Sequence, residues 1–500
     1  MRRSVRALSF SCGFISLSAE ILWVRLFGFA NMSTPKAFGF VLSFYLVGIA
    51  AGAAAGRSVC KAGTSDERLW RHAAAALLLS GATVLLAPVV FATASLLDTR
   101  LFVAAACILA TAFTVAYIFP IVHHLGAESK QQAQGGAFAN VYFYNVMGAA
   151  LGPLATGYVV LGLMTLQQAF CFVALLSIAA AVFFNPRGNS LRFSSAAAAV
   201  AMLLIFAISL EKHWLVQELN SNSQHAKTVI ENRYGIITVF NDEKKGDAVF
   251  GGNVYDGRTN LSGEVNSNGL HRPMLLTALH AKPRRVLVLG LSVGTWLALI
   301  NEFEGVELVD VVEINPGYIE LAKAYPEQAK AMADPRVNLV INDARRWLRT
   351  SGAAKYDLIV MNTTFHWRSN SSLLLSSDFL RQVKTHMAPG AILTFNTTGS
   401  PDALYTATRV FNNAYRYSNF VYASDHDFRA KKEDFASRQR FSSLKVSGSP
   451  VFMTGSAKAA ELLDEPFVTV EAEAIKAGRP LEEITDSNML VEFKFGRNLN

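Results

Sequence analysis

The sequence predicts two folds in one chain: a multi-pass α-helical membrane domain, then an α/β domain with a small β-module at its start. The composition of the 500 residues changes near residue 212. Before that point, apolar runs of about 20 residues follow one another, which is the length of helix that crosses a bilayer. After it, short apolar runs alternate with helix-like segments, which is typical of a parallel, doubly wound sheet. We expect a membrane domain over 1–212, a β-module over 226–270, a ligand-binding α/β domain over 271–425 and its extension over 426–500.

Seven apolar runs make up the expected membrane domain, over 8–30, 38–56, 73–97, 101–121, 137–160, 163–184 and 193–210. The first run has no small-residue cleavage site, so we expect it to remain as an anchor. Basic residues gather on one side if all seven runs cross, which predicts a cytoplasmic N-terminus and a location in the inner cell membrane. Seven crossings place the soluble half on the periplasmic side, whereas it is cytoplasmic if the short run 193–210 does not cross.

Two features of the apolar half concern contacts inside a membrane. The segments 48–56 and 148–152 carry glycines at four-residue spacing, which predicts close packing of helices in lipid. Glu20 and Arg25 are candidates for a solute pathway, because charged groups inside a membrane are costly and often functional. The alternative is that both side chains lie near an interface and reach for water.

Composition also limits the partners. The net charge of +8 does not predict nucleic-acid binding, since many of the basic residues lie at the ends of apolar runs. The expected partner is the lipid bilayer. All four cysteines lie in the apolar half without a CxxC pair, which argues against a disulfide framework and against a metal site. The oligomeric state stays open, with a homo-oligomer as one alternative.

The soluble half predicts a regular order of elements. Short strands over 228–255, joined by a polar turn at 243–247, form the β-module. A helix over 267–283 follows. The strands expected after it are 286–290, 307–313, 337–341, 357–362 and 391–396, and the helices between them are 294–303, 316–331, 344–350 and 376–387.

Residues 286–315 are the most informative stretch of the chain. An apolar run opens into a turn that contains glycine, a helix-like segment follows, and a second apolar run ends on Glu313. This is the layout of a nucleoside-binding βαβ unit, in which backbone approaches the ligand at the turn and the acid accepts from ribose hydroxyls. The alternative for Glu313 is a solvated acid at a strand end.

These residues carry a resemblance to a known family. The segments HRPMLLTALHAKPRRVLVLG, VVEINP, NDARRWL, YDLIVMN and DFLRQVKTHMAPGAILTF resemble the spermidine synthase (polyamine aminopropyltransferase) family over about 226–425. The resemblance implies the Rossmann-like fold of class I S-adenosylmethionine-dependent methyltransferases. The closing segment ITDSNMLVEF and the apolar N-terminal half are similar to the membrane-fused members of that family.

The resemblance implies a cofactor, S-adenosylmethionine or its decarboxylated form, and residues that bind it. Gly290, Ser292 and Gly294 belong to the expected cofactor loop, and Glu313 would bind the ribose. In the pair Asn342-Asp343, the aspartate would accept from the adenine amino group, with a helix N-cap as the rival role. Because this cofactor is made in the cytosol, the resemblance favours a cytoplasmic soluble half.

Departures from the family concern the acceptor. Val293 stands where the family has an acid in its glycine-rich turn, and Asn362 stands where it has an aspartate that helps to deprotonate the attacking amine. The family's Tyr-His-Glu reads Leu270-His271-Arg272 here. An amide cannot take a proton at neutral pH. Since a polycation needs carboxylates, we expect an acceptor that is neutral or anionic, either a small molecule or a lipid-linked group, and not an ordinary polyamine.

A different polar set lies where the acceptor is expected. Asn362-Thr363-Thr364 and Asn396-Thr397-Thr398 end neighbouring strands, and such ends line the ligand crevice. His366 is the first candidate for a general base because its ordinary pKa lies near neutrality. The other expected catalytic residues are Asn362 and His271. The expected substrate-binding residues are Tyr234, Arg272, Thr364, Trp367, Arg368 and Asn396.

Those polar residues have alternative roles too. Arg272 and Arg368 would clamp an anion together, or they are surface charges, and the histidines are bases or merely structural. The leading hypothesis is a membrane-anchored transferase that moves an aminopropyl, aminocarboxypropyl or methyl group. Its alternatives are cleavage or cyclisation of the cofactor without an acceptor, and a transporter or sensor whose soluble domain binds a nucleoside without turnover.

Overall fold

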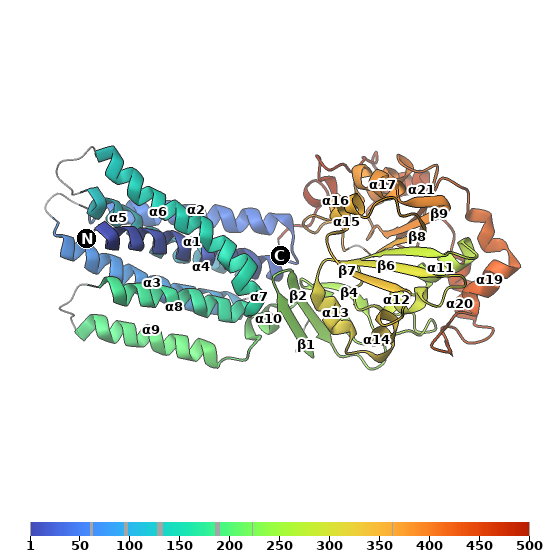
Figure 1. Ribbon diagram of the computed structural model, residues 1–500, viewed down its shortest axis with the longest axis horizontal. Coiled ribbons are helices and arrows are strands. Elements are labelled where there is room, and N and C mark those ends of the chain that lie inside the picture. The colour runs from blue at the N-terminus through green and yellow to red at the C-terminus, as the bar shows by residue number, and fades with distance from the viewer. Residues whose placement is uncertain are drawn as a thin grey trace. The chain divides into compact units, whose positions relative to one another are not determined.

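The computed structural model describes residues 2–60, 64–94, 99–127, 134–185, 191–222, 224–362 and 364–499 (Figure 1). The chain divides into two compact units. One consists of Met1–His225 with Glu231–Arg233 and Leu499–Asn500, and the other of Ala226–Ile230 with Tyr234–Asn498. The composition change near residue 212 therefore lies shortly before the main division of the chain.

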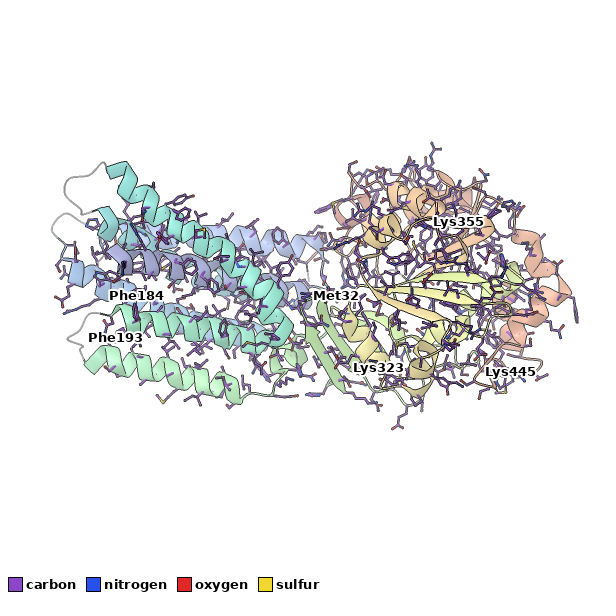
Figure 2. All side chains as sticks on the ribbon, in the orientation of Figure 1. Met32, Phe184, Phe193, Lys323, Lys355 and Lys445 are labelled. Carbon is purple, nitrogen blue, oxygen red and sulfur yellow. The ribbon has the colours of Figure 1, made fainter. Side chains whose placement is uncertain are left out.

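The first unit is a bundle of helices. They are α1 (Arg2–Ala30), α2 (Pro35–Arg57), α3 (Asp66–Thr93), α4 (Arg100–Ala116), α5 (Ile118–Ala127), α6 (Gln134–Leu154), η1 (Ala155–Val160), α7 (Leu161–Leu163), α8 (Leu166–Phe184), α9 (Leu191–Ser209) and α10 (Trp214–Leu219). Met32 lies at the opposite end of the bundle from Phe184 and Phe193 (Figure 2). The long helices therefore run the length of this unit.

Six helical stretches among the described residues are long and apolar enough to cross a membrane. They are Arg3–Ala30, Pro35–Arg57, Asp66–Thr93, Arg100–Gly126, Phe138–Leu163 and Leu166–Phe184. The seventh expected span is helical, but its apolar part, Phe193–Ser209, is shorter than the other six. It was also the weakest of the seven apolar runs in the sequence.

The spaced glycines lie where helices touch. A Cβ on Gly52 would lie 2.3 Å from the carbonyl oxygen of Phe113, and one on Gly148 would lie 2.0 Å from that of Phe10. No side chain fits at either distance. The glycines of 48–56 therefore let α2 approach α4, and those of 148–152 let α6 approach α1.

The second unit begins with the β-module, a four-stranded sheet in the order β1-β2-β3-β4. Its strands are β1 (Thr228–Asn232), β2 (Gly235–Phe240), β3 (Ala248–Gly251) and β4 (Val254–Arg258). The polar turn expected at 243–247 joins β2 to β3. Helix α11 (His271–Leu279) follows, and it is shorter than the helix expected over 267–283.

A seven-stranded sheet in the order β10-β11-β9-β8-β5-β6-β7 forms the centre of this unit. Its strands are β5 (Arg285–Leu289), β6 (Leu308–Glu313), β7 (Val337–Ile341), β8 (Tyr356–Met361), β9 (Met387–Asn396), β10 (Asn413–Tyr417) and β11 (Phe420–Ser424). Strands β5 to β9 are parallel, as expected, while β11 is antiparallel to both β9 and β10. The sheet is therefore mixed, because a hairpin that was not predicted completes one edge.

Both faces of this sheet are buried, as a doubly wound sheet requires. Val286 and Val288 belong to one apolar core, while Leu287 and Leu289 belong to the other. Helices cover the two faces (Figure 1). They are α12 (Thr295–Ile300), α13 (Pro316–Ala322), α14 (Pro326–Met332), α15 (Ala344–Thr350), α16 (Ser372–Leu375), α17 (Ser377–Lys384) and α18 (Pro401–Thr408). The single helix expected over 316–331 is divided because proline disfavours helical backbone in the residue before it, and Pro326 begins α14.

The C-terminal extension packs on the same unit. It contains η2 (Arg429–Glu433), α19 (Phe435–Ser442), β12 (Lys445–Val446), β13 (Ser449–Pro450), α20 (Ala457–Asp464), α21 (Val470–Ala477) and α22 (Leu490–Phe493). Phe441 and Phe452 join the core on one face of the sheet, and Ile484 and Val491 join the core on the other. The extension therefore completes both cores.

Candidate functional site

The turn after β5 is held against the carboxyl ends of its two neighbouring strands. Gly290 has a φ of +90°, and a Cβ there would lie 2.9 Å from the carbonyl oxygen of Asn362. Its amide donates to the carbonyl oxygen of Val312 over 2.9 Å. Only glycine combines this positive φ with so close an approach. Glycine is therefore required at this position, because a side chain would collide with the end of β8.

The rest of the turn leads into α12. Gly294, with a φ of +85°, is the N-cap of this helix. Ser292 is buried with a φ of +51°, and its hydroxyl donates to the backbone oxygen of Asp256 over 3.3 Å. A serine rarely adopts this left-handed conformation, so its contact with β4 holds the turn in a strained shape.

Glu313 ends β6 as a buried acid. Its two carboxylate oxygens accept from the amides of Leu291 and Asn315, each over 2.8 Å. Burial raises the pKa of Glu313 to about 7, and the Asp256 carboxylate adds to this rise, while the two amides oppose it. Each carboxylate oxygen keeps further acceptor capacity. The residue therefore fits a diol such as ribose, and it is not a solvated strand-end acid.

Asn342 and Asp343 follow β7. The Asp343 carboxylate accepts from the amide of Arg346 over 2.8 Å, so it is the N-cap of α15. Its own amide donates to the side-chain oxygen of Asn342 over 2.9 Å. The capping role is thus present in the structure. Because a carboxylate has two oxygens, a role in adenine binding is compatible with it and stays a prediction.

Val293 does not face a site in this structure. Its side chain is fully buried in an apolar cluster with Ile237 and Val249 of the β-module and with Leu321 of α13. The acid that the resemblance leads one to expect there is thus replaced by a packing residue. The Val293 side chain therefore packs the β-module against the α/β fold.

Asp256 on β4 is an acid near the cofactor loop that sequence reasoning missed. Its carboxylate is hydrogen bonded to the hydroxyl of Tyr318, and it interacts with the Arg368 guanidinium. Burial raises the pKa of Asp256, and these two partners oppose the rise. A Cβ on Gly251 would lie 2.2 Å from the Tyr318 hydroxyl, so this glycine gives the hydroxyl its space. In the sequence, Asp256-Gly257 looks like a turn, and nothing marks the aspartate as part of a site.

His366 lies on the loop after β8 and contacts the segment after β9. Its ring nitrogen Nδ1 is 2.9 Å from the hydroxyl of Thr398, and its amide donates to the same hydroxyl over 2.8 Å. Thr398 has a φ of +48°, a conformation that threonine rarely adopts. Burial lowers the pKa of His366, while a hydrogen bond at Thr398 and the Asp402 carboxylate oppose this shift. The imidazole is therefore neutral at pH 7 and able to accept a proton.

A chain of hydrogen bonds extends from Thr398. Its amide donates to the Asn396 side-chain oxygen over 2.8 Å, and the Asn419 side-chain amide donates to the same oxygen over 2.9 Å. Arg272 donates to the Asn419 side-chain oxygen over 2.9 Å. Three residues expected at the site, His366, Asn396 and Arg272, are therefore connected through Thr398 and Asn419, which were not expected to link them.

The two arginines expected to clamp an anion contact separate sets of residues. Arg272 also donates to the carbonyl oxygens of Asn268 and Gly269, and its guanidinium packs on the Trp296 and Phe420 rings. These contacts favour a structural role for it. Arg368 donates to the Thr364 hydroxyl over 2.6 Å. Arg368 thus remains a candidate for binding an anionic group, and a clamp formed by both arginines stays a prediction.

His271 lies in a different environment from His366. Its ring is buried, its Nδ1 is 2.8 Å from the side-chain nitrogen of Asn266, and it packs edge-on against Tyr417. Burial, reinforced by the neighbouring Arg272, lowers the pKa of His271 to about 3. Such an imidazole is a weak base, so the structure favours a structural role for this second candidate.

The remaining expected residues lie at the edges of the region. Trp367 packs beside Phe365, with ring centroids 5.5 Å apart, and the Arg497 guanidinium lies 5.3 Å from its ring centroid. One aromatic surface of Trp367 is therefore already in use. Tyr234 is 42 % exposed at the turn between β1 and β2. Asn362 begins the loop after β8, where its amide donates to Leu289, and Thr363 lies outside the described residues.

The C-terminal segment holds the His366 loop in place. The buried Glu492 carboxylate accepts from the amides of Asn370 and Ser372, over 2.9 and 2.8 Å. The Ser371 hydroxyl, between them in the chain, donates to the carbonyl oxygen of His366 over 2.6 Å. The closing segment therefore supports the candidate base from more than 120 residues away.

Among the described residues, no group of three or more His, Cys, Asp or Glu side chains could hold a metal ion. The chemical groups of the region include the glycine turn, Glu313, Asp256, the His366–Thr398 pair and Arg368.

Comparisons with known proteins identify a family domain in the second unit. Residues 270–418 match the spermine/spermidine synthase domain. Spermine synthase of Arabidopsis thaliana is 33 % identical over 114 residues, which are 23 % of this chain and 32 % of that protein. Polyamine aminopropyltransferase 2 of Streptomyces coelicolor is 26 % identical over 54 % of this chain and 50 % of its own length. Polyamine aminopropyltransferase of Thermococcus onnurineus is 28 % identical over 38 % of this chain and 65 % of its own length.

The chain thus spans between a third and two thirds of the length of these curated relatives. Among solved structures, it is similar to spermidine synthase in complex with the transition-state analogue AdoDATO. The identity is 16 %, the TM-score is 0.36, and the match covers 51 % of this chain and 85 % of that chain.

Proposed function

Since the C-terminal half of this chain is a member of the spermidine synthase-like family, we propose that it is an alkyl transferase that binds S-adenosylmethionine or its decarboxylated form. The group transferred is aminopropyl, aminocarboxypropyl or methyl, and the acceptor is neutral or anionic. The observation that carries this proposal is a contrast between two groups of strand ends. The acids Glu313 and Asp343 follow β6 and β7, whereas amides, hydroxyls and the His366 imidazole follow β8 and β9.

The nucleoside-binding edge supports the cofactor class. The glycine turn at Gly290 brings backbone close to the neighbouring strand ends, and Glu313 offers acceptor capacity for the ribose hydroxyls. When bound, this cofactor supplies a carbon attached to a positive sulfur, which a nucleophile can attack. The protein's part is to align the two reactants and to exclude water.

His366 is the proposed base, and Thr398 is a positioning residue for it. The Thr398 hydroxyl has one hydrogen, which it donates to the carbonyl oxygen of Thr397 over 2.9 Å. It therefore acts as an acceptor toward His366, so Nδ1 carries the ring proton and Nε2 carries the free lone pair. A base at Nε2 removes a proton from a neutral acceptor and so makes it a better nucleophile.

The choice of acceptor follows from charge. Asp256 has a carboxylate, the kind of group that a polyamine needs. This carboxylate is already hydrogen bonded to Tyr318, and it interacts with the Arg368 guanidinium. Asn362 and Val293 supply no negative charge where the resemblance leads one to expect acids. A polycationic acceptor would therefore leave charged amines unpaired in this region, at a cost of several kcal/mol.

The experiment that tests this proposal measures products. The purified full-length protein in detergent is incubated with each cofactor form, alone and with putrescine, with neutral amines or alcohols and with anionic acceptors, and products are identified by mass spectrometry. We expect transfer to a neutral or anionic acceptor and little spermidine. Spermidine formation at ordinary turnover would contradict the proposed acceptor class. Methylthioadenosine release without any acceptor would show cleavage or cyclisation instead of transfer.

We also propose that the helical unit anchors the enzyme in the inner cell membrane, with the N-terminus in the cytoplasm. The loop between α2 and α3 is flanked by Arg57, Arg68 and Arg71, in agreement with a cytoplasmic loop. Six crossings return the chain to the cytoplasm, whereas a seventh crossing by α9, which packs on α3 and α8, places the soluble unit in the periplasm. A reporter fused to the C-terminus distinguishes these two topologies, because a periplasm-specific reporter is active only after seven crossings.

A further inference from the structure

Polar side chains meet in the interior of the helical unit. The Tyr45 hydroxyl of α2 donates to the carbonyl oxygen of Ser16 on α1 over 2.6 Å. The Trp23 indole of α1 donates to the Thr111 hydroxyl of α4 over 3.2 Å. All four residues are buried. Helices α1, α2 and α4 are therefore joined by hydrogen bonds in a region where apolar packing alone would suffice.

Glu20 lies between these two connections. It follows Ser16 by four residues and precedes Trp23 by three, so the three side chains share one face of α1. Its carboxylate is close enough to the Tyr45 hydroxyl to act on it electrostatically. Glu20 is partly buried, and it is the ionisable member of this polar group. We call Ser16, Glu20, Trp23, Tyr45 and Thr111 the bundle polar group.

Three members of the bundle polar group, one from each helix, lie at similar depths. Glu20 is ten residues from the end of α1 at Ala30, Tyr45 is ten residues from the start of α2, and Thr111 is eleven residues from the start of α4. At about 1.5 Å per residue, each lies about 15 Å from that end of the bundle. This is half of the ~30 Å hydrocarbon thickness that these helices are long enough to span.

Glu20 therefore lies deeper in the bundle than Arg25, the other charged residue that the sequence offered for a solute pathway. Arg25 is five residues from the end of α1, about 7 Å, a depth from which a long side chain reaches the interface. A charged carboxylate at the centre of a bilayer costs at least ~2.5 kcal/mol. A carboxyl group avoids that cost when it takes up a proton.

We propose that Glu20 is a proton-binding site at the centre of the helical unit, which gives this unit a proton-linked activity separate from alkyl transfer. On binding, one O–H bond forms at the carboxylate as one breaks in hydronium, with no change of oxidation state. The proposal does not depend on the reaction of the soluble unit. It requires that the carboxyl exchange its proton with bulk water while the bundle stays folded.

The test is infrared difference spectroscopy of the full-length chain in lipid nanodiscs, between acidic and alkaline buffer in the absence of sodium. We expect a protonated-carboxyl band that titrates reversibly, that is lost in Glu20→Gln and that is kept in Glu67→Gln. Glu67 is a matched control, because it is an exposed carboxylate at the start of α3. Tyr45→Phe should keep the amplitude of the band and move its position, because a neighbouring hydroxyl has been removed.

Three outcomes would overturn the proposal: a band that survives Glu20→Gln, no titrating band assignable to Glu20, or a titration midpoint that moves with sodium concentration. The last result would assign the site to a metal cation. Glu20→Asp, which keeps an ionisable carboxyl, separates loss of the site from misfolding. We expect it to keep a titrating band at a changed position, and circular dichroism checks the helix content of each variant.

Discussion

Two neighbouring groups of strand ends in the central sheet carry different acids and bases. We call the ends of β5, β6 and β7 the nucleoside edge and the ends of β8 and β9 the acceptor edge. At the carboxyl ends of β5, β6 and β7, a bare glycine turn meets the buried acid Glu313 and the capping acid Asp343. At the ends of β8 and β9, the groups are Asn362, the His366–Thr398 pair and Asn396. Glu313 and Asp343 are acids that the family resemblance predicts, whereas Val293 in the glycine turn and Asn362 at the end of β8 depart from it.

This difference teaches where the chain is constrained. Under the proposed function, a nucleoside offers the same hydroxyls and amino group whatever the acceptor is, so the strand ends that bind it keep their acid. An acceptor of another charge needs another set of groups, and in this proposal the neutral His366 imidazole takes the place of a carboxylate as base. The comparison can be tested by changing one edge at a time.

The largest effect is expected from His366→Gln. Removing a general base lowers kcat about 10²–10⁴-fold. Affinity for the cofactor, measured by calorimetry, should stay within about twofold of wild type, because His366 lies on the other edge. His426→Gln is the matched control, since that histidine is exposed on a loop after β11. An equal loss of cofactor affinity in His366→Gln would show that the two edges are not separate.

The next effect concerns the stability of the nucleoside edge. Glu313 has a pKa of about 7 in the folded protein against an ordinary value of 4.5. Because the folded value is the higher one, the contribution of Glu313 to stability is fully present below pH 4.5 and is lost as the pH rises through about 7. We expect wild type to lose about 3 kcal/mol relative to Glu313→Gln over this window.

Denaturant unfolding of both proteins in the same detergent, at several pH values between 4.5 and 7, measures that difference. Glu307→Gln, which removes an exposed ion pair with Arg284 just before the start of β6, should follow wild type at each pH. A constant difference between wild type and Glu313→Gln across the window would contradict the raised pKa.

The sequence was informative about the parallel core and less so about the rest. Strands β5 to β8 lie within a residue or two of their expected positions, because each is an apolar run ended by glycine, acid or amide. The β10–β11 hairpin was missed, since its residues give no such punctuation. Contacts between distant residues were missed for a different reason: Asp256 meets Tyr318 and Glu492 meets Asn370 only in the folded chain.

Two predicted roles were based on residue type alone, although burial decides what these side chains do. His271 and Arg272 carry reactive groups, and the sequence does not show which side of α11 faces the core. The structure buries the imidazole and surrounds the guanidinium with carbonyl oxygens and aromatic rings. By contrast, His366 was expected at the site, and its partner Thr398 was named only as part of a polar triplet.

A smaller effect is expected when a negative charge is added at the end of β8. Asn362→Asp places a carboxylate where the resemblance leads one to expect one. A charge-assisted hydrogen bond contributes about 1.5–3 kcal/mol, so we expect use of putrescine, measured as kcat/KM with decarboxylated cofactor, to rise about tenfold or more. Use of an anionic acceptor should fall. Asn396→Asp is a control at the next strand, and an equal gain there would mean that overall charge matters more than position.

The smallest effect tests how His366 is positioned. Thr398→Val removes the hydroxyl that accepts from Nδ1, so the imidazole loses its preference for one tautomer, and a single hydrogen bond of this kind contributes about 0.5–1.5 kcal/mol. We expect kcat to fall about 2–10-fold with KM for the cofactor unchanged, and the acidic limb of the pH–rate profile to move. Thr398→Ser keeps a hydroxyl and should restore both. If Thr398→Ser and Thr398→Val lose the same activity, the strained backbone at this position matters and the hydroxyl does not. The fixed tautomer of His366 would then no longer explain how a neutral imidazole takes the place of a carboxylate base.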